Sequence, residues 1–258
     1  MSKKEISKHI PGIYNYCDRW CERCAFTNRC LNFENTGTLS PWQNDISNKA
    51  FWDNLGKKLE DKIKLLHKAA KKYDIDLNAI TKEESEEYSR KEKKDRQSAK
   101  NHPLAKITWL YADEAGKFLE DNELLMRKIA EKVSHFNMGI QTRDSLEKET
   151  AGIGDYYEII TWYLHFIHVK FMRALMGKID DDGWEEENGY PKDSDGSAKV
   201  AIISIERSIE AWASIMQIIP EAEDKIIDIL SLLQKSLRLA EAEFPEARKF
   251  IRPGFDEQ

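Results

Sequence analysis

Cysteine is absent from almost the whole of this 258-residue chain: residues 1–16 and 31–258 contain none. The sequence also lacks any run of about 18 uncharged apolar residues, so it predicts no membrane-spanning helix. The N-terminus, Met-Ser-Lys-Lys-Glu-Ile-Ser-Lys-His, has no apolar segment of the kind found in secretory leaders. Together these absences predict a cytoplasmic protein with no membrane partner.

Segments of alternating apolar and polar residues, bounded by hairpin signals, are missing too. Such segments mark half-buried β-strands, so their absence predicts an all-α fold. The net charge of -6 disfavours a protein that coats nucleic acid. Residues 90–106 are locally basic, with seven Lys and Arg against two acidic residues, but mixed charge runs are usually solvated helices or linkers. We therefore expect no nucleic-acid partner, whereas a protein partner remains open.

Apolar periodicity predicts a bundle of five or six helices within residues 47–258. Two of them are apolar on nearly every face and are expected at its centre. The expected helices cover about 47–73, a charged stretch starting at Thr81, 103–136 with a bend near Asp121-Asn122, 155–177, 198–219 and 221–243. The central pair is 155–177 and 198–219.

The remaining segments are predicted from their polarity. Residues 74–102 are expected to form a charged helix or linker, and residues 141–154 a polar connection that is either irregular or itself partly helical. Residues 178–197 are expected to form an acidic loop before a helix capped by Ser197. Residues 1–46 are predicted to form a polar arm and a small cysteine module. Five aromatic residues of this module are expected to surround a metal and to dock the module on the helices: Tyr14, Tyr16, Trp20, Phe26 and Phe33.

All the cysteines fall in one fourteen-residue segment, Cys17-Asp-Arg-Trp-Cys21-Glu-Arg-Cys24-Ala-Phe-Thr-Asn-Arg-Cys30. Cysteines that act only as small core residues would be scattered among the helices, so clustering favours a bound metal. The spacing C-x3-C-x2-C-x5-C can aim four sulfur ligands at one centre, which suits Zn²⁺ or an iron–sulfur cluster. Disulfides need an oxidising compartment, which the missing leader disfavours. We therefore predict that Cys17, Cys21, Cys24 and Cys30 bind a metal centre.

The run Cys21-x2-Cys24-Ala-Phe26-x3-Cys30 resembles the C-x2-C-x-[Phe/Tyr]-x3-C ligand run of RecB-like nucleases, such as those of CRISPR adaptation. It is also similar to the auxiliary-cluster (SPASM) motifs. The resemblance implies a 4Fe–4S cluster, with Cys21, Cys24 and Cys30 carried over position by position. The nucleases place their fourth cysteine far upstream, whereas only Cys17 is left here. No strand-borne acidic nuclease motif is present, so the cluster is implied and the nuclease activity is not.

These observations predict a 4Fe–4S protein that works in electron transfer, redox sensing or partner binding. A structural zinc module on a helical bundle is the first alternative. A second is a metalloenzyme whose site lies inside the bundle, because carboxylates and imidazoles on paired helices hold metals in ferritin-like proteins. The candidate ligands are Glu158, His165 and His168 on one central helix and Glu206 and Glu210 on the other.

The pattern of these polar residues favours packing over a second metal site. The Glu-x-x-His pairs of ferritin-like proteins are missing. Arg173, Arg207 or Lys170 could instead neutralise the carboxylates in structural ion pairs. We therefore expect the two histidines to be core residues with satisfied hydrogen bonds.

Overall fold

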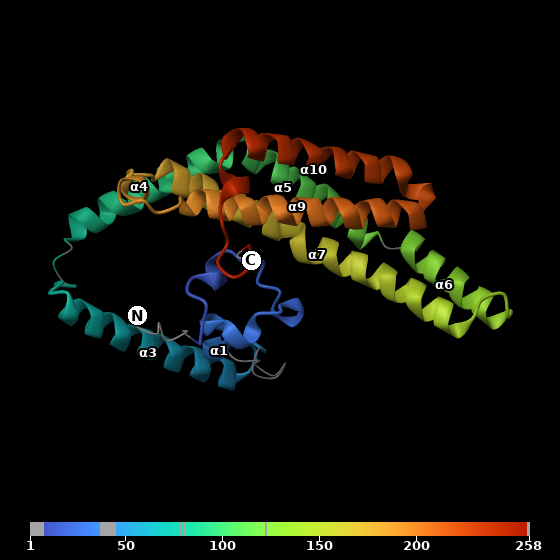
Figure 1. The fold of residues 1–258 in the computed structure, drawn as a ribbon, viewed down its shortest axis with the longest axis horizontal. Helices are drawn as coiled ribbons and strands as arrows, with labels where there is room; N and C mark the ends of the chain where they lie inside the picture. Colours follow the sequence, from blue (N-terminus) through green and yellow to red (C-terminus); the bar gives the residue numbers. More distant parts are fainter. Residues whose placement is uncertain (1–7, 37–44, 78, 80, 122, 257–258) are drawn as a thin grey trace, which may run out of the picture. The chain divides into compact units, whose positions relative to one another are not determined.

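A computed structural model describes residues 8–36, 45–77, 79, 81–121 and 123–256. All regular structure in these residues is helical and none is β-strand, which confirms the predicted all-α class (Figure 1). The described residues contain nine α-helices, more than the five or six expected. Much of the predicted N-terminal arm, and Asn122 of the predicted bend, lie outside the described part. No helix within the described part combines the length and apolar character needed to cross a bilayer.

Contacts divide the chain into two compact units. Unit 1 consists of Met1–Tyr14 and Trp20–Lys94, and unit 2 of Asn15–Arg19 and Asp95–Gln258. The five residues Asn15–Arg19 therefore belong to unit 2, although the chain on both sides of them belongs to unit 1. The sequence predicts a domain boundary between residues 46 and 47. That boundary stays a prediction.

The long helices of unit 1 begin with polar caps. α3 (Lys49–Lys72) follows Asn48, whose side-chain oxygen accepts a backbone N–H of the first turn at 3.0 Å. α4 (Lys82–Asn101) follows Thr81, whose hydroxyl accepts the N–H of Glu84 at 3.2 Å. The Glu84 carboxylate accepts the Thr81 N–H in return at 2.8 Å. This reciprocal capping box confirms the predicted start of the charged helix, which continues into unit 2 from residue 95.

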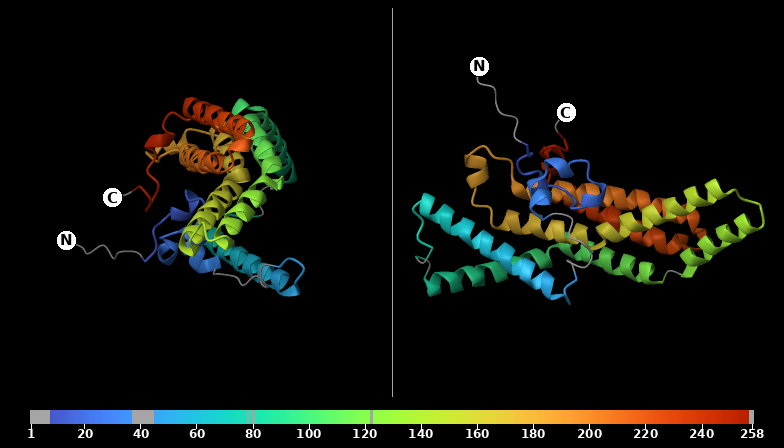
Figure 2. Two further views of the ribbon diagram at one scale, coloured as in Figure 1. Left: turned by 90° about the vertical axis from the view of Figure 1, so that its right-hand side faces the viewer. Right: turned by 90° about the horizontal axis from the view of Figure 1, so that it is seen from below.

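Four helices form the core of unit 2: α5 (Pro103–Glu120), α7 (Arg143–Ile179), α9 (Asp193–Ile218) and α10 (Glu223–Glu243). Each packs against two of the others, in the order α5, α7, α9, α10 around the bundle, which Figure 2 (left) views end-on. Successive members run in opposite directions (Figure 1). α6 (Glu123–Asn137) packs against α7, and the short α8 (Trp184–Glu187) lies in the connection from α7 to α9.

The pairing of α7 with α9 is the most extensive contact of the bundle. Their buried side chains recur every three or four residues, the spacing of one helical face. They include Ile160, Tyr163, Ile167 and Phe171 on α7 and Ile202, Ile205, Trp212 and Ile215 on α9. The two helices predicted to be central therefore supply much of the core.

Two helix starts differ from the sequence-based expectation. α7 begins at Arg143, after the cap Thr142, and includes Gly152 and Gly154, which were expected to end a connection. Each glycine costs about 1 kcal/mol relative to alanine inside a helix, an amount that tertiary packing can offset. α9 begins at Asp193, so Ser197 is a buried residue of the helix and not its cap.

Two connections differ as well. The predicted acidic loop contains α8 and the first residues of α9, whose two early aspartates suit the positive end of a helix dipole. The predicted helix 103–136 is two helices, because α5 ends at Glu120 and α6 begins at Glu123. The expected bend is thus a break between separate helices.

Gly196 in α9 provides a direct test of this packing. A Cβ added there would lie 2.4 Å from the Tyr16 ring and 2.6 Å from the Phe250 ring, closer than carbon atoms approach. We expect Gly196→Ala to lower the free energy of unfolding by about 1–3 kcal/mol, measured by denaturant titration. The control is Gly154→Ala in α7, where a Cβ meets nothing within 4 Å. It should leave stability unchanged or raise it by up to about 1 kcal/mol. Equal stability of the two variants would contradict the close packing of the Tyr16 and Phe250 rings against Gly196.

Candidate functional site

Three of the four cysteines lie on or beside short 3-10 turns. Cys21 opens the turn Cys21–Arg23, Cys24 follows it, and Cys30 follows the turn Thr27–Arg29. Cys17, Cys21, Cys24 and Cys30 are each half-buried, and none is in a disulfide. Across the described ranges, no three His, Cys, Asp or Glu side chains gather as a group that could hold a metal ion.

Two of the sulfur atoms accept a backbone N–H from the second residue after the cysteine. The Phe26 N–H donates to Cys24 Sγ at 3.4 Å, and the Arg19 N–H donates to Cys17. Arg19 has a φ of 61°, in the left-handed region that residues other than glycine rarely adopt. Because an N–H donor stabilises a thiolate more than a thiol, this local geometry suits sulfur ligands of a metal.

Residues Asn15–Arg19, which we call the strap, lie against α7 and α9 of the same unit. Asp18 makes the central contacts: its Oδ2 accepts from Tyr163 Oη and from Arg207 Nη1, each at 2.8 Å. Arg207 Nη1 also donates to Tyr163 Oη at 2.6 Å, and Trp162 Nε1 donates to the Asp18 carbonyl at 3.0 Å. Burial, followed by the charge of Asp18, raises the pKa of Tyr163 to about 12, so its hydroxyl remains a donor at neutral pH.

Tyr16 provides the second anchor of the strap. Its hydroxyl donates to Asp193 Oδ1 at 2.9 Å, and Arg173 Nη2 pairs with the same carboxylate at 2.8 Å. The Tyr16 ring lies with its centroid 4.6 Å from that of Phe250, above Gly196. Burial foremost, and then the Asp193 charge, raises the pKa of Tyr16 well above its ordinary value. Of the five aromatic residues expected to dock on the helices, Tyr16 contacts α9 through Asp193.

Cys17 lies in the middle of the strap. Burial raises the pKa of its thiol, while the Arg19 N–H and the positive charges of Arg19 and Lys170 act in the opposite direction. Lys170, on α7, is buried and donates from Nζ to the Asn15 carbonyl at 3.5 Å. Cys17 is therefore half-buried, with the positive charges of Arg19 and Lys170 and the negative charge of Asp18 nearby.

The carboxylates predicted for a site inside the bundle are not directed into it. Glu158 and Glu210 are exposed, and Glu206 accepts from Arg248 Nη2 at 2.8 Å. The cations expected to neutralise them pair elsewhere: Arg207 with Asp18, Arg173 with Asp193, and Lys170 with the Asn15 carbonyl. Sequence periodicity placed these residues on faces but could not select their partners.

The two histidines of α7 lie on the side that faces α5. His165 is exposed, and half-buried His168 shares a hydrogen bond of 3.1 Å between its Nδ1 and Thr108 Oγ1. The Trp109 ring lies close to both imidazoles, with centroids 6.4 Å and 5.3 Å away. For His168 this agrees with the expectation of a packed histidine with a satisfied hydrogen bond. For His165 the expectation of a core residue is wrong, because its side chain is exposed on the surface of α7.

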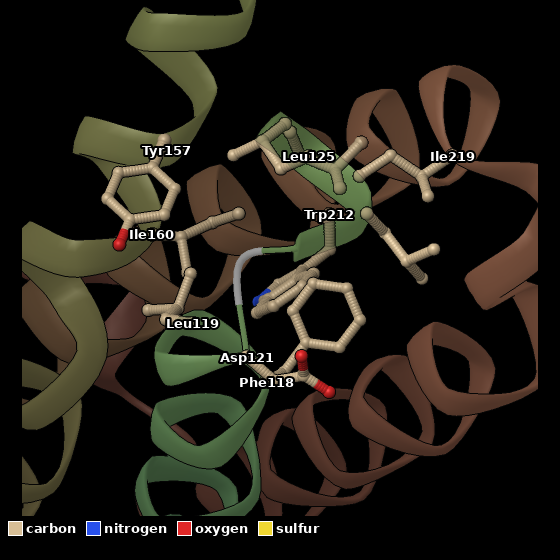
Figure 3. Close-up of a pocket in the computed structure, with 10 residues that line it drawn as sticks. Phe118, Leu119, Asp121, Leu125, Tyr157, Ile160, Trp212 and Ile219 are labelled. Carbon is tan, nitrogen blue, oxygen red and sulfur yellow. The ribbon is translucent and has the colours of Figure 1, made fainter. Parts of the chain in front are cut away.

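A small cavity lies where α5 ends and α6 begins, and Figure 3 shows its lining. It measures about 20 Å³ and is mainly apolar, with side chains that include Phe118, Leu125, Tyr157, Trp212 and Ile219. That volume is close to the space one water molecule occupies, so a substrate does not fit. An open groove of about 320 Å³ between α5 and α10 is lined by charged side chains such as Glu114, Lys117 and Asp228.

Comparisons with known protein families, with curated proteins and with solved structures found no match to this chain. Functional inference therefore rests on its own residues. The sequence drew attention to the cysteines but missed Asp18, because its partner Arg207 is 189 residues away.

The strap anchor can be tested with a double-mutant cycle of Asp18→Asn and Arg207→Met. Because the pair is partly exposed and solvent screens it, we expect a coupling free energy of about 1 kcal/mol from unfolding measurements. The matched control is Arg143→Met with Glu147→Gln, an i,i+4 pair at the same distance of 2.8 Å but far more exposed. Its coupling should be clearly smaller. Equal coupling in both cycles would show that the Asp18–Arg207 pair contributes no more than an ordinary exposed ion pair.

The pKa of His168 leads to a prediction about how the free energy of unfolding depends on pH. Its pKa is lowered, foremost by burial and then by His165 and Lys100, while a hydrogen bond to the Ala105 backbone acts in the opposite direction. The folded state therefore favours neutral His168. This contribution is complete above the unfolded-state pKa of about 6.5 and is lost as the pH falls through the lower folded-state pKa.

We therefore expect the wild type to lose more stability than His168→Gln between about pH 7 and pH 5. Denaturant titrations at several pH values measure the difference, and subtracting the two profiles removes the other titrating groups. Parallel profiles for the two proteins would show that the native environment does not favour neutral His168.

Proposed function

We propose that the Cys17–Cys30 segment binds a metal centre through its four thiolates, and that the centre is a 4Fe–4S cluster. The clustering of every cysteine of the chain within fourteen residues carries this proposal. Four thiolates are the usual ligand set of such a cluster. The implied ligands are Cys17, Cys21, Cys24 and Cys30.

The local hydrogen bonding supports thiolate chemistry. The N–H donors at Cys17 and Cys24 stabilise negative charge on sulfur, and hydrogen bonds to sulfur are one of the ways in which a protein sets a cluster potential. A cluster bound here supplies one-electron chemistry. Zn²⁺ suits the same four sulfurs and would give the segment a structural role instead.

The strap suggests how a metal centre would act on the rest of the protein. Cys17 is flanked by Tyr16 and Asp18, which bond to side chains of α7 and α9. A change of metal occupancy or oxidation state at Cys17 would therefore alter the contacts that its neighbours make with α7 and α9. Redox sensing, with a helical surface as the output to a protein partner, is the role that we favour.

Purification without oxygen, followed by metal analysis and visible spectroscopy, tests this proposal. We expect iron and acid-labile sulfide in equal amounts, with a brown colour that bleaches on reduction. A colourless protein that holds one Zn²⁺ would replace the cluster with the structural zinc alternative. Metal that remains after all four cysteines are changed to serine would assign the metal to the bundle, for example to His165 and His168.

Single Cys→Ser variants test whether the four thiols share one site. Each of the four substitutions should release most of the metal, because serine is a poor ligand for these ions. Thr27→Ala, a non-ligand change within the same segment, is the control and should retain the metal. Full retention by two or more serine variants would contradict a shared site.

The same variants also report on stability. Helical circular dichroism should remain, because the large helical core of unit 2 does not depend on a bound metal as a zinc finger does. Loss of all helical signal on chelation would contradict this separation of fold and metal.

A further inference from the structure

The helix α3 carries an apolar stripe that is open to solvent. Five side chains spaced three or four residues apart form the stripe: Trp52, Leu55, Leu59, Ile63 and Leu66. Each of them is between 38% and 57% exposed. Within the described residues of unit 1, no other helix packs extensively against α3. An amphipathic helix normally buries such a stripe, so its exposure indicates a surface that another molecule covers.

The charges of α3 select the kind of molecule that fits this stripe. The helix has eight lysines and three acidic residues, a net charge of +5 with His67 neutral, whereas the whole chain carries -6. At about 100° per residue, Lys49 and Lys62 lie on opposite borders of the stripe. The three acidic residues lie about 100° or more from Leu59 at its centre. The borders of the stripe are therefore positive, and they fit a negatively charged surface.

We propose that α3 binds the surface of an anionic lipid bilayer and lies in the plane of the headgroups, with the stripe facing the acyl chains. Helices that lie on bilayers in this way have Trp and Leu on one face and lysines on the other. Lysines at the border extend their charged ends to the headgroups while their stems cover apolar surface. This inference does not depend on the proposed metal centre.

Other molecules fit the stripe less well. A second copy of the chain would place its own basic helix against this one, and like charges that face each other repel. A protein groove would need acidic residues along both of its edges, whereas an anionic bilayer meets both borders at once. The expectation of no membrane partner rested on the lack of a segment that could cross a bilayer, and a helix on its surface needs no such segment.

Vesicles of two compositions test the requirement for negative charge. The full-length protein is mixed with vesicles of phosphatidylcholine alone, or of phosphatidylcholine and phosphatidylserine in equal parts, and the bound fraction is measured by sedimentation. We expect binding to be at least about tenfold tighter with phosphatidylserine, because several lysines then lie near an anionic surface. Added salt should weaken that binding, since it screens exposed charges.

Two neighbouring leucines provide a matched test of the stripe. Leu65 and Leu66 are 58% and 56% exposed, but Leu65 lies about 120° from the centre of the stripe. We expect Leu66→Gln to weaken binding to the vesicles that contain phosphatidylserine by about tenfold, because a leucine that leaves water contributes that much or more. Leu65→Gln should stay within a few-fold of the wild type. Both side chains are exposed without lipid, so the two variants should unfold at the same denaturant concentration.

A second pair of variants tests the lysines at the borders. Lys49→Gln combined with Lys62→Gln should weaken binding to the same vesicles by about tenfold or more. The control is Lys235→Gln with Arg238→Gln, which removes the same charge from exposed positions of α10. The control should stay within a few-fold of the wild type, and equal losses in the two double variants would overturn the proposal.

The other occupants of the stripe predict different results, each of which would overturn the proposal. If a second copy covers it, the wild type is a dimer that Leu66→Gln converts to monomers, and vesicles bind neither. If the rest of the chain covers it, Leu66→Gln lowers the free energy of unfolding, Leu65→Gln does not, and vesicles bind neither. A monomeric wild type that binds no vesicles would assign the stripe to an acidic protein partner. Equal vesicle binding by Leu66→Gln and Leu65→Gln would show that the stripe does not contact lipid.

Discussion

The packing of α7 against α9 is the contact on which the arrangement of unit 2 depends. It buries the large side chains of both helices, and its outer surface is also the platform for the strap. Tyr163 shows the double use: its ring is fully buried in the bundle, while its hydroxyl donates to Asp18. Arg207 reaches the same carboxylate from α9. The rotation of each helix about its axis therefore fixes both the core and the position of Cys17.

The sequence was sufficient for the parts of the fold that local periodicity encodes. Apolar spacing identified the helices around Ile167 and Ile205, and Thr81 with Glu84 identified the start of the charged helix. Helix ends were less predictable, because they depend on contacts that no local pattern records. Gly152 and Gly154 suggested a break, yet α7 passes through both. The aspartates before Ser197 carried a helix-start signal that the acidic composition of the segment obscured.

The candidate site divides in the same way. The four cysteines lie within one short segment, so their spacing can be recognised from the sequence alone. The partners of Asp18 and Tyr16 lie more than 140 residues away, and choosing them requires the rotation of two helices and the path of the strap. Arg173, Arg207 and Lys170 were recognisable as cations that needed partners, but the nearest carboxylates in the sequence were the wrong ones. Gly196 is small because two aromatic rings occupy the space of its side chain, and no local rule predicts that requirement.

The proposed ligands are held in different ways. Cys17 is fixed by neighbours that bond to α7 and α9, whereas Cys21, Cys24 and Cys30 adjoin turns held mainly by short-range hydrogen bonds. In general, segments held by local hydrogen bonds open at lower cost than segments packed on a core. The position of Cys17 thus depends on side chains from two helices of unit 2, which no pattern near the cysteines in the sequence records.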